Sequence, residues 1–212
     1  MSILDKDEHR DSLSDVLSAI VANPAGEAEW LDLLSQLEYV GCRKIIKAIP
    51  YHQIDEGILQ HVSEEASHAF LLKAAARKRG LEAKNWGESR LSRVGWRYFS
   101  RLDTAVSALE GADGMRYPAV SWAIERRVLA VYPAYAEIST DPAVKGVLAR
   151  ILAQEERHGA HFNACPFPDA FRARVLAVEV PLWSEFRDEL ANYFLLHGKT
   201  RDSSWVPLST PS

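Results

Sequence analysis

Two stretches of this sequence share one short pattern, HVSEEASHAFLL at residues 61–72 and ILAQEERHGAHF at residues 151–162. In each stretch a glutamate is followed three positions later by a histidine, which pairs Glu65 with His68 and Glu155 with His158. On an α-helix such positions lie on one face, about 5–6 Å apart at Cβ, so the carboxylate and the imidazole can bind the same metal ion. A single copy arises often by chance, and its specificity depends on the residues around it.

Helical spacing places further glutamates on apolar faces. Glu38 follows Leu31 by seven positions and precedes Ile45 by seven, which puts its carboxylate in an apolar stripe. Glu125 and Glu155 lie in equivalent stripes. A buried carboxylate without a partner is costly enough that it becomes protonated or acquires a cation. Several of them converging on one core indicate a metal site.

The spacing of the four glutamates also fits two helical hairpins. Two residues meet across an antiparallel helix pair only when they lie at similar distances from the turn. The midpoint of Glu38 and Glu65 falls between residues 51 and 52, and that of Glu125 and Glu155 falls at residue 140. Both positions are predicted turns, because proline and capping residues mark them independently, at Pro50 and at Asp141-Pro142. Each hairpin therefore offers one glutamate and one Glu-x-x-His motif.

The chain as a whole is expected to be all-α. Helices are predicted at 8–22, 27–48, 52–79, 87–110, 118–138, 142–163 and 168–197, and strand patterns are nearly absent. With 212 residues, 47% of them hydrophobic, we expect a single domain over 1–212. The bundle core spans about 27–163, and residues 164–212 supply a C-terminal helix followed by an extended tail.

Composition excludes several classes of partner. A net charge of −4 does not favour nucleic acid, and the basic run from Lys73 to Arg79 is too short to change this, so we interpret it as a solvated helix end. No apolar run approaches the roughly 20 residues of a membrane span, and the first residues do not resemble an export signal. Two cysteines without a CxxC pair fit a reducing compartment. We therefore expect a cytoplasmic protein without an integral membrane segment.

On these residues the sequence resembles the ferritin-like di-iron carboxylate proteins, whose bundle core uses one glutamate from each of two helices and Glu-x-x-His from each of the other two. The resemblance covers about residues 38–158 and implies an antiparallel four-helix bundle with additional flanking helices. It implies that Glu65 and Glu155 bridge two metal ions. Glu38 and His68 would complete one site, and Glu125 and His158 the other. Carboxylate and imidazole ligands without thiolates favour two iron ions, with manganese or a mixed pair as alternatives.

The resemblance implies an oxidoreductase that uses dioxygen or peroxide. We favour an oxygenase, oxidase or hydroxylase acting on a small or hydrophobic organic substrate, supplied with electrons by an unidentified donor. The alternatives are a rubrerythrin-like or ferritin-like peroxidase or iron-oxidising protein, and a non-catalytic helical scaffold. A homodimer through an outer helix face is expected.

Two sets of residues have open roles at this point. His61 lies one turn before Glu65 and His161 one turn after His158, so each is a partner of the ligands, an extra ligand or an ordinary histidine. The aromatic residues of the helix between the hairpins either cover the bundle or wall a pocket; they include Trp96, Tyr98 and Phe99.

Overall fold

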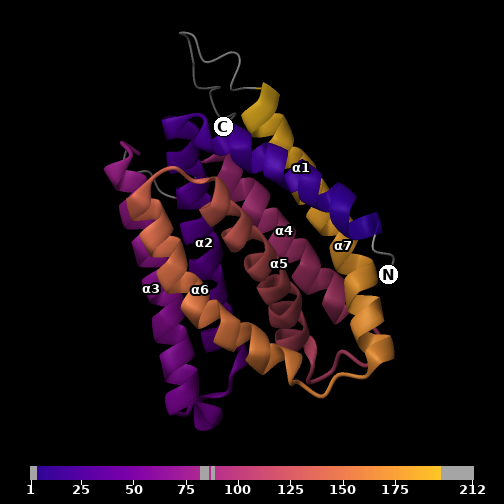
Figure 1. Ribbon diagram of the computed structural model, residues 1–212. Coiled ribbons are helices and arrows are strands. Elements are labelled where there is room, and N and C mark those ends of the chain that lie inside the picture. The colour runs from indigo at the N-terminus through magenta and orange to yellow at the C-terminus, as the bar shows by residue number, and fades with distance from the viewer. Residues whose placement is uncertain (1–3, 82–85, 87–88, 197–212) are drawn as a thin grey trace, which may run out of the picture.

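A computed structural model describes residues 4–81, 86 and 89–196 (Figure 1). These residues form seven α-helices and no strand, which confirms the predicted all-α class. The helices are α1 (Leu4–Val21), α2 (Pro24–Ala48), α3 (Glu56–Lys78), α4 (Arg90–Ser107), α5 (Arg116–Ile138), α6 (Pro142–Asn163) and α7 (Asp169–Ala191). A 3-10 turn, η1 (Tyr51–Gln53), precedes α3, and a π-helical turn, η3 (Asn192–Leu196), continues α7.

The helices are arranged as two hairpins and a covering pair. α2 packs chiefly on α3, and α5 packs chiefly on α6, while contacts from α3 to α6 and from α2 to α5 join the two hairpins. The pair formed by α4 and α7 packs against α2 and α5 from the other side, and α1 lies across α2, α5 and α7 (Figure 1). The turns of both hairpins lie where the glutamate spacing predicts them.

Capping residues explain where the helices begin. Asn23 accepts hydrogen bonds from the backbone of Ala25 and Gly26, and proline occupies the next position, so α2 starts three residues before its predicted start. Asp55 caps α3, which therefore starts later than predicted, after the turn η1. Asp141 caps α6 as predicted.

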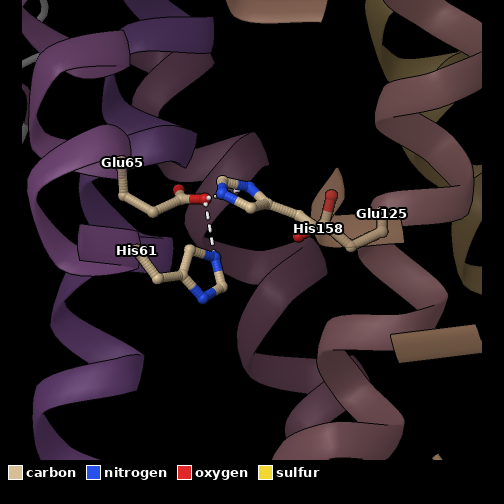
Figure 2. Close-up of side chains that lie close together, drawn as sticks. All are labelled: His61, Glu65, Glu125 and His158. Carbon is tan, nitrogen blue, oxygen red and sulfur yellow. Dashed lines mark ion pairs between the residues drawn. The ribbon is translucent and has the colours of Figure 1, made fainter. Parts of the chain in front are cut away.

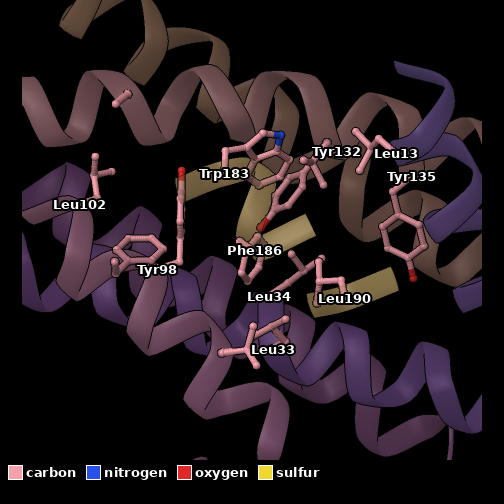
Figure 3. Packing of buried hydrophobic residues seen from close by; sticks show 14 of the residues in the cluster. Leu13, Leu33, Leu34, Tyr98, Leu102, Tyr132, Tyr135, Trp183, Phe186 and Leu190 are labelled. Carbon is pink, nitrogen blue, oxygen red and sulfur yellow. The ribbon is translucent and has the colours of Figure 1, made fainter. Parts of the chain in front are cut away.

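The interior has two parts with different chemistry. Between α2, α5 and the α4/α7 pair lies an apolar core with many aromatic side chains (Figure 3). Tyr98 of α4 stacks on Phe186 of α7, with ring centroids 5.1 Å apart, and Trp183 packs against both rings. Between the two hairpins, by contrast, the buried side chains include acids and histidines.

The basic run from Lys73 to Arg79 differs from the prediction. Arg79 is not a solvated residue: its guanidinium lies 2.6 Å from the buried Glu27 and 2.8 Å from Asp141. The run is therefore partly structural, because its last member neutralises an acid of α2. The predicted extended tail at the C-terminus lies outside the described residues.

Two further observations bear on the sequence interpretation. Among the described helices, none combines the length and the apolar character that crossing a membrane requires. Cys42 and Cys165 are both free thiols.

Candidate metal centre

All six predicted ligand residues lie in one buried cluster between the two hairpins. Each side chain is at most 7% exposed. They come from four helices, with Glu38 on α2, Glu65 and His68 on α3, Glu125 on α5, and Glu155 and His158 on α6. Their neighbours Arg126, Glu156 and Arg157 are exposed, as the helical spacing predicts.

The ligand atoms of this cluster form two overlapping groups. In the first group, one atom from each residue lies within 4.8 Å of all the others, and the members are Glu38, Glu65, His68 and Glu155. The second group meets the same criterion and comprises His61, Glu65, Glu125 and His158 (Figure 2). Glu65 belongs to both groups, which fits a carboxylate shared by two ions.

Glu155 connects the two groups through its two oxygens. Its Oε1 lies 2.8 Å from Nδ1 of His68, and its Oε2 lies 3.2 Å from Nδ1 of His158. Glu38 Oε2 approaches His68 Nδ1 to 3.5 Å, and Glu65 Oε1 approaches His158 Nδ1 to 3.4 Å. Both imidazoles therefore direct Nδ1 toward carboxylates, and the carboxylates of Glu65 and Glu155 lie between the two histidines.

A hydrogen-bonded chain outside the cluster assigns the tautomers of these histidines. Nε2 of His158 donates to Oε2 of Glu64 at 2.9 Å. Glu64 also accepts from the amide nitrogen of Gln154, which turns the amide oxygen of Gln154 toward Nε2 of His68 at 2.7 Å. Since a carboxylate and an amide oxygen only accept, both Nε2 atoms carry the proton. In the neutral form of each ring, Nδ1 then presents a lone pair to the cluster, and in the protonated form Nδ1 carries the second proton.

When the rings are neutral and no metal is bound, lone pairs consequently face one another without a donor between them. His68 Nδ1 and Glu155 Oε1 are both buried and, despite the 2.8 Å that separates them, neither takes part in a well-oriented hydrogen bond. Oε2 of Glu125 is likewise buried without a hydrogen-bond partner. Acceptors that converge in this way require a positive charge among them, supplied by protons or by a metal ion. The donor set of carboxylates and Nδ1 atoms suits a divalent metal.

Two other buried carboxylates of the same chain provide an internal control. Glu27 pairs with Arg79 and accepts a hydrogen bond from the Tyr135 hydroxyl at 2.8 Å. Glu179 is held by Arg127 through two hydrogen bonds of 2.7 and 2.6 Å, and it also accepts from the Tyr98 hydroxyl. The ion pairs found in the described part of the chain join none of Glu38, Glu65, Glu125 and Glu155 to an arginine or a lysine. Within the described residues, this cluster therefore has histidines but no arginine or lysine to neutralise its carboxylates.

The pKa values of the cluster residues are shifted by their burial and by the carboxylates around them. Burial raises the pKa of Glu38 to about 8; the neighbouring carboxylates add to this effect, and the nearby imidazole of His68 opposes it. Burial also raises the pKa of Glu125 well above its usual value, and the charge of Glu155 adds to this effect. Burial alone would lower the pKa of the histidines, but the facing carboxylates raise it to about 11 for His68 and about 10 for His158. The cluster thus attracts positive charge strongly.

Two residues beside the cluster fix its geometry. The hydroxyl of Tyr132 on α5 donates to Oε1 of Glu38, which orients that carboxylate. Gly41 lies one turn after Glu38, and a Cβ at this position would come within 2.8 Å of Oε2 of Glu65. A glycine here lets the carboxylate of α3 lie close to the backbone of α2.

A cavity of about 90 Å³ adjoins the cluster. Its lining extends from Trp30 to Ile45 on α2 and from Tyr117 to Tyr132 on α5, about 22 Å of helix in each case at 1.5 Å per residue. Most of its wall is apolar, and its polar part includes the four cluster carboxylates and His61. On the α4/α7 side the cavity is lined by four aromatic residues, Tyr98, Phe99, Trp183 and Phe186. Tyr98 and Phe99 of α4 therefore wall a pocket, whereas Trp96 of the same helix is exposed.

The hydrogen-bonding partners of the ligands were missed at the sequence level. Glu64 and Gln154 each precede a cluster glutamate by one residue, at positions that helical periodicity places beside the apolar face. Both motifs carry an acid or an amide directly before their glutamate, and this shared position could have been used to predict a partner for the histidines. His61 joins the second group of ligand atoms, whereas His161 is exposed and packs against Phe162.

No protein-family model, no curated protein and no solved structure matches this chain.

Proposed function

We propose that this protein is a ferritin-like di-metal oxidoreductase that uses dioxygen or peroxide to oxidise a small, largely apolar organic substrate. The observation that carries the proposal is the buried cluster of four carboxylates and two histidines without a compensating arginine or lysine. Four carboxylates balance two divalent ions in charge, so a loaded centre is close to neutral and compatible with its apolar surroundings.

The residues of the cluster divide between two metal subsites. Glu38 and His68 would hold one ion and Glu125 and His158 the other, with Glu65 and Glu155 shared between them. When bound, a pair of reduced iron or manganese ions supplies oxygen or peroxide activation. Glu64 and Gln154 keep the Nε2–H of each histidine occupied, so that Nδ1 stays free to bind metal.

The adjoining cavity supports an organic substrate. It is long, it is walled mainly by aliphatic and aromatic side chains, and the cluster carboxylates form part of its surface. Its lining includes the buried Trp30 toward the start of α2, Lys44 toward the end of α2 and Tyr117 at the start of α5, and the last two are partly exposed. An elongated apolar molecule that entered near Lys44 would pass the cluster and be shielded from water.

Metal analysis followed by oxygen uptake tests the proposal. The protein is expressed in medium supplemented with iron or manganese, and its metal content is measured; about two ions per chain are expected. The ferrous protein is then mixed with aerobic buffer and a panel of aldehydes, quinols and alkyl aromatic compounds, and substrate-dependent oxygen uptake and product formation are recorded. Less than one metal ion per chain after both supplements would reject the centre, and the chain would then be a helical scaffold.

A cavity variant separates substrate binding from metal binding. Val128 lies one turn after Glu125 and lines the cavity, so Val128→Phe is expected to shorten the cavity without touching a ligand. This variant should keep both metal ions and lose turnover of the longest substrates first. If the variant and the wild type turned over all substrates equally well, the substrate would not bind in this cavity.

Iron oxidation without an organic substrate is the second candidate. It predicts fast oxidation of added ferrous ion, unaffected by Val128→Phe. A large assembly on gel filtration, together with stored iron, would favour it over the oxygenase.

A further inference from the structure

We infer that His61 is a seventh metal ligand, which gives the two subsites different donor sets. The inference rests on the proposed di-metal centre and concerns only the subsite that contains Glu125 and His158. That subsite would have two imidazole nitrogens, whereas the subsite of Glu38 and His68 would have one.

The position of His61 supports this role. It lies on α3 one turn before Glu65, and its Nε2 is 3.3 Å from Oε1 of Glu65. Its ring faces that of His158, with the centroids 4.0 Å apart (Figure 2). Its side chain is 15% exposed, and it lines the cavity beside the cluster carboxylates. One ligand atom of His61 lies within 4.8 Å of one atom of each of Glu65, Glu125 and His158.

A hydrogen bond to Glu65 alone would not account for the whole arrangement. Such a bond satisfies one oxygen of Glu65, yet Oε2 of the 7% exposed Glu125 still has no hydrogen-bond partner. A cation among the four side chains satisfies the carboxylates and the imidazoles together. Three helices contribute to this group, and the adjacent open space of the cavity leaves room for an exogenous ligand.

The donor sets predict different metal preferences. Exchanging oxygen donors for imidazole nitrogens favours later divalent metals, such as cobalt, over manganese. The subsite with His61 and His158 should therefore bind cobalt more tightly than the subsite with His68, and manganese should compete least well there. Two unequal binding steps are the expected signature.

Anaerobic titration of the metal-free protein with cobalt(II) tests the inference, because the visible absorption of cobalt reports its coordination. The wild type is expected to bind two equivalents in two distinguishable steps. His61→Gln should weaken one step by at least about tenfold, which is the lower range for loss of a metal-supporting interaction, and should change the absorption of that step. The matched control is His161→Gln, which removes an exposed histidine of the neighbouring helix and should leave both steps unchanged.

The outcomes separate this inference from the proposed function. If the wild type binds two equivalents and His61→Gln binds them with the same affinities and spectra, His61 is not a ligand and the centre has six. If the wild type binds less than one equivalent, both proposals fail together. Manganese competition adds a second readout: in the wild type manganese should displace cobalt from one step more easily than from the other, and in His61→Gln this difference should shrink. Circular dichroism at the titration temperature verifies that each variant is folded.

Discussion

Buried carboxylates occur in two kinds of environment in this molecule. Glu27 and Glu179 lie outside the cluster, and each is 1% exposed. Each is neutralised by an arginine and also accepts a hydrogen bond from a tyrosine hydroxyl. The four cluster carboxylates are buried to a similar degree between the two hairpins, but their partners are histidines, one another and, for Glu38, the hydroxyl of Tyr132. The same chain therefore neutralises some buried acids with its own cations and leaves others to be neutralised from outside.

This difference distinguishes a structural carboxylate from one that is available to bind a metal ion. An ion pair between an arginine and a carboxylate forms when the chain folds, and removing either partner leaves the other as an unpaired buried charge. A buried carboxylate that faces another carboxylate does not stabilise the fold until a proton or a metal ion binds to it. The two regions should consequently respond in opposite ways to substitution, metal and pH.

The largest expected effect is the loss of metal when the shared carboxylate is removed. Glu155→Gln takes away the group whose two oxygens lie against both histidines, so we expect metal affinity to fall by more than about a hundredfold, beyond the range for indirect partners. Metal content is measured after dialysis against a weak chelator. The control is Glu156→Gln, the adjacent exposed acid, which should retain two ions. Equal metal content in the two variants would contradict the role of Glu155.

The second effect is on the stability of the metal-free protein. Arg79→Met leaves Glu27 buried without its cation and should lower the free energy of unfolding by about 3 kcal/mol. Glu125→Gln should leave that free energy unchanged or raise it, because it removes one acid from a group of like charges. Urea denaturation in the presence of a chelator measures both variants. If Glu125→Gln proved the more damaging of the two, the distinction between the two kinds of carboxylate would be wrong.

The third effect is smaller and concerns Glu64. Glu64→Gln replaces the acceptor that orients His158 and Gln154, so metal affinity should fall by about 10–100-fold while two ions still bind at saturation. Competition with a coloured chelator measures the affinity. Arg157→Gln removes the exposed partner of Glu64 and should change the affinity by no more than about twofold. A similar loss in both variants would mean that surface charge, and not the orientation of the histidines, is responsible.

The smallest effect is a pH dependence of opposite sign with and without metal. The raised pKa values of about 11 for His68 and about 10 for His158 mean that the folded metal-free protein holds protons that the unfolded chain releases near pH 6.5. This stabilisation is fully present below about pH 6.5 and is lost as pH rises through about 10 to 11. Metal must displace the same protons, so its affinity should rise with pH by about tenfold per unit for each proton displaced.

Thermal unfolding between pH 6.5 and 9.5 measures both slopes. The melting temperature of the metal-free protein should fall across this range, while the extra stability conferred by added metal should grow. Parallel slopes for the two forms would indicate that the bound ion does not replace the histidine protons.

Much of this architecture is predictable because it depends on local spacing. Helical periodicity, the capping residue Asp141 and the proline-marked turns place the helices, and equal distances from each turn bring Glu38 opposite Glu65 and Glu125 opposite Glu155. These are properties of positions within one helix or one hairpin. The starts of α2 at Pro24 and of α3 at Glu56 differ from the predicted starts by a few residues. The cap at Asn23 moves the first start earlier, and the short turn η1 before Asp55 moves the second later.

Other features depend on how the two hairpins meet, which no local pattern describes. The sequence by itself determined an all-helical chain and the inward direction of six ligand-type side chains, because side-chain direction follows from the 3.6-residue period. Only the tertiary structure decided that His61 joins the cluster while His161 does not, that Glu64 and Gln154 assign the histidine tautomers, and that Arg79 neutralises Glu27. Those contacts join residues far apart along the chain, so they are fixed by the packing of one helix against another.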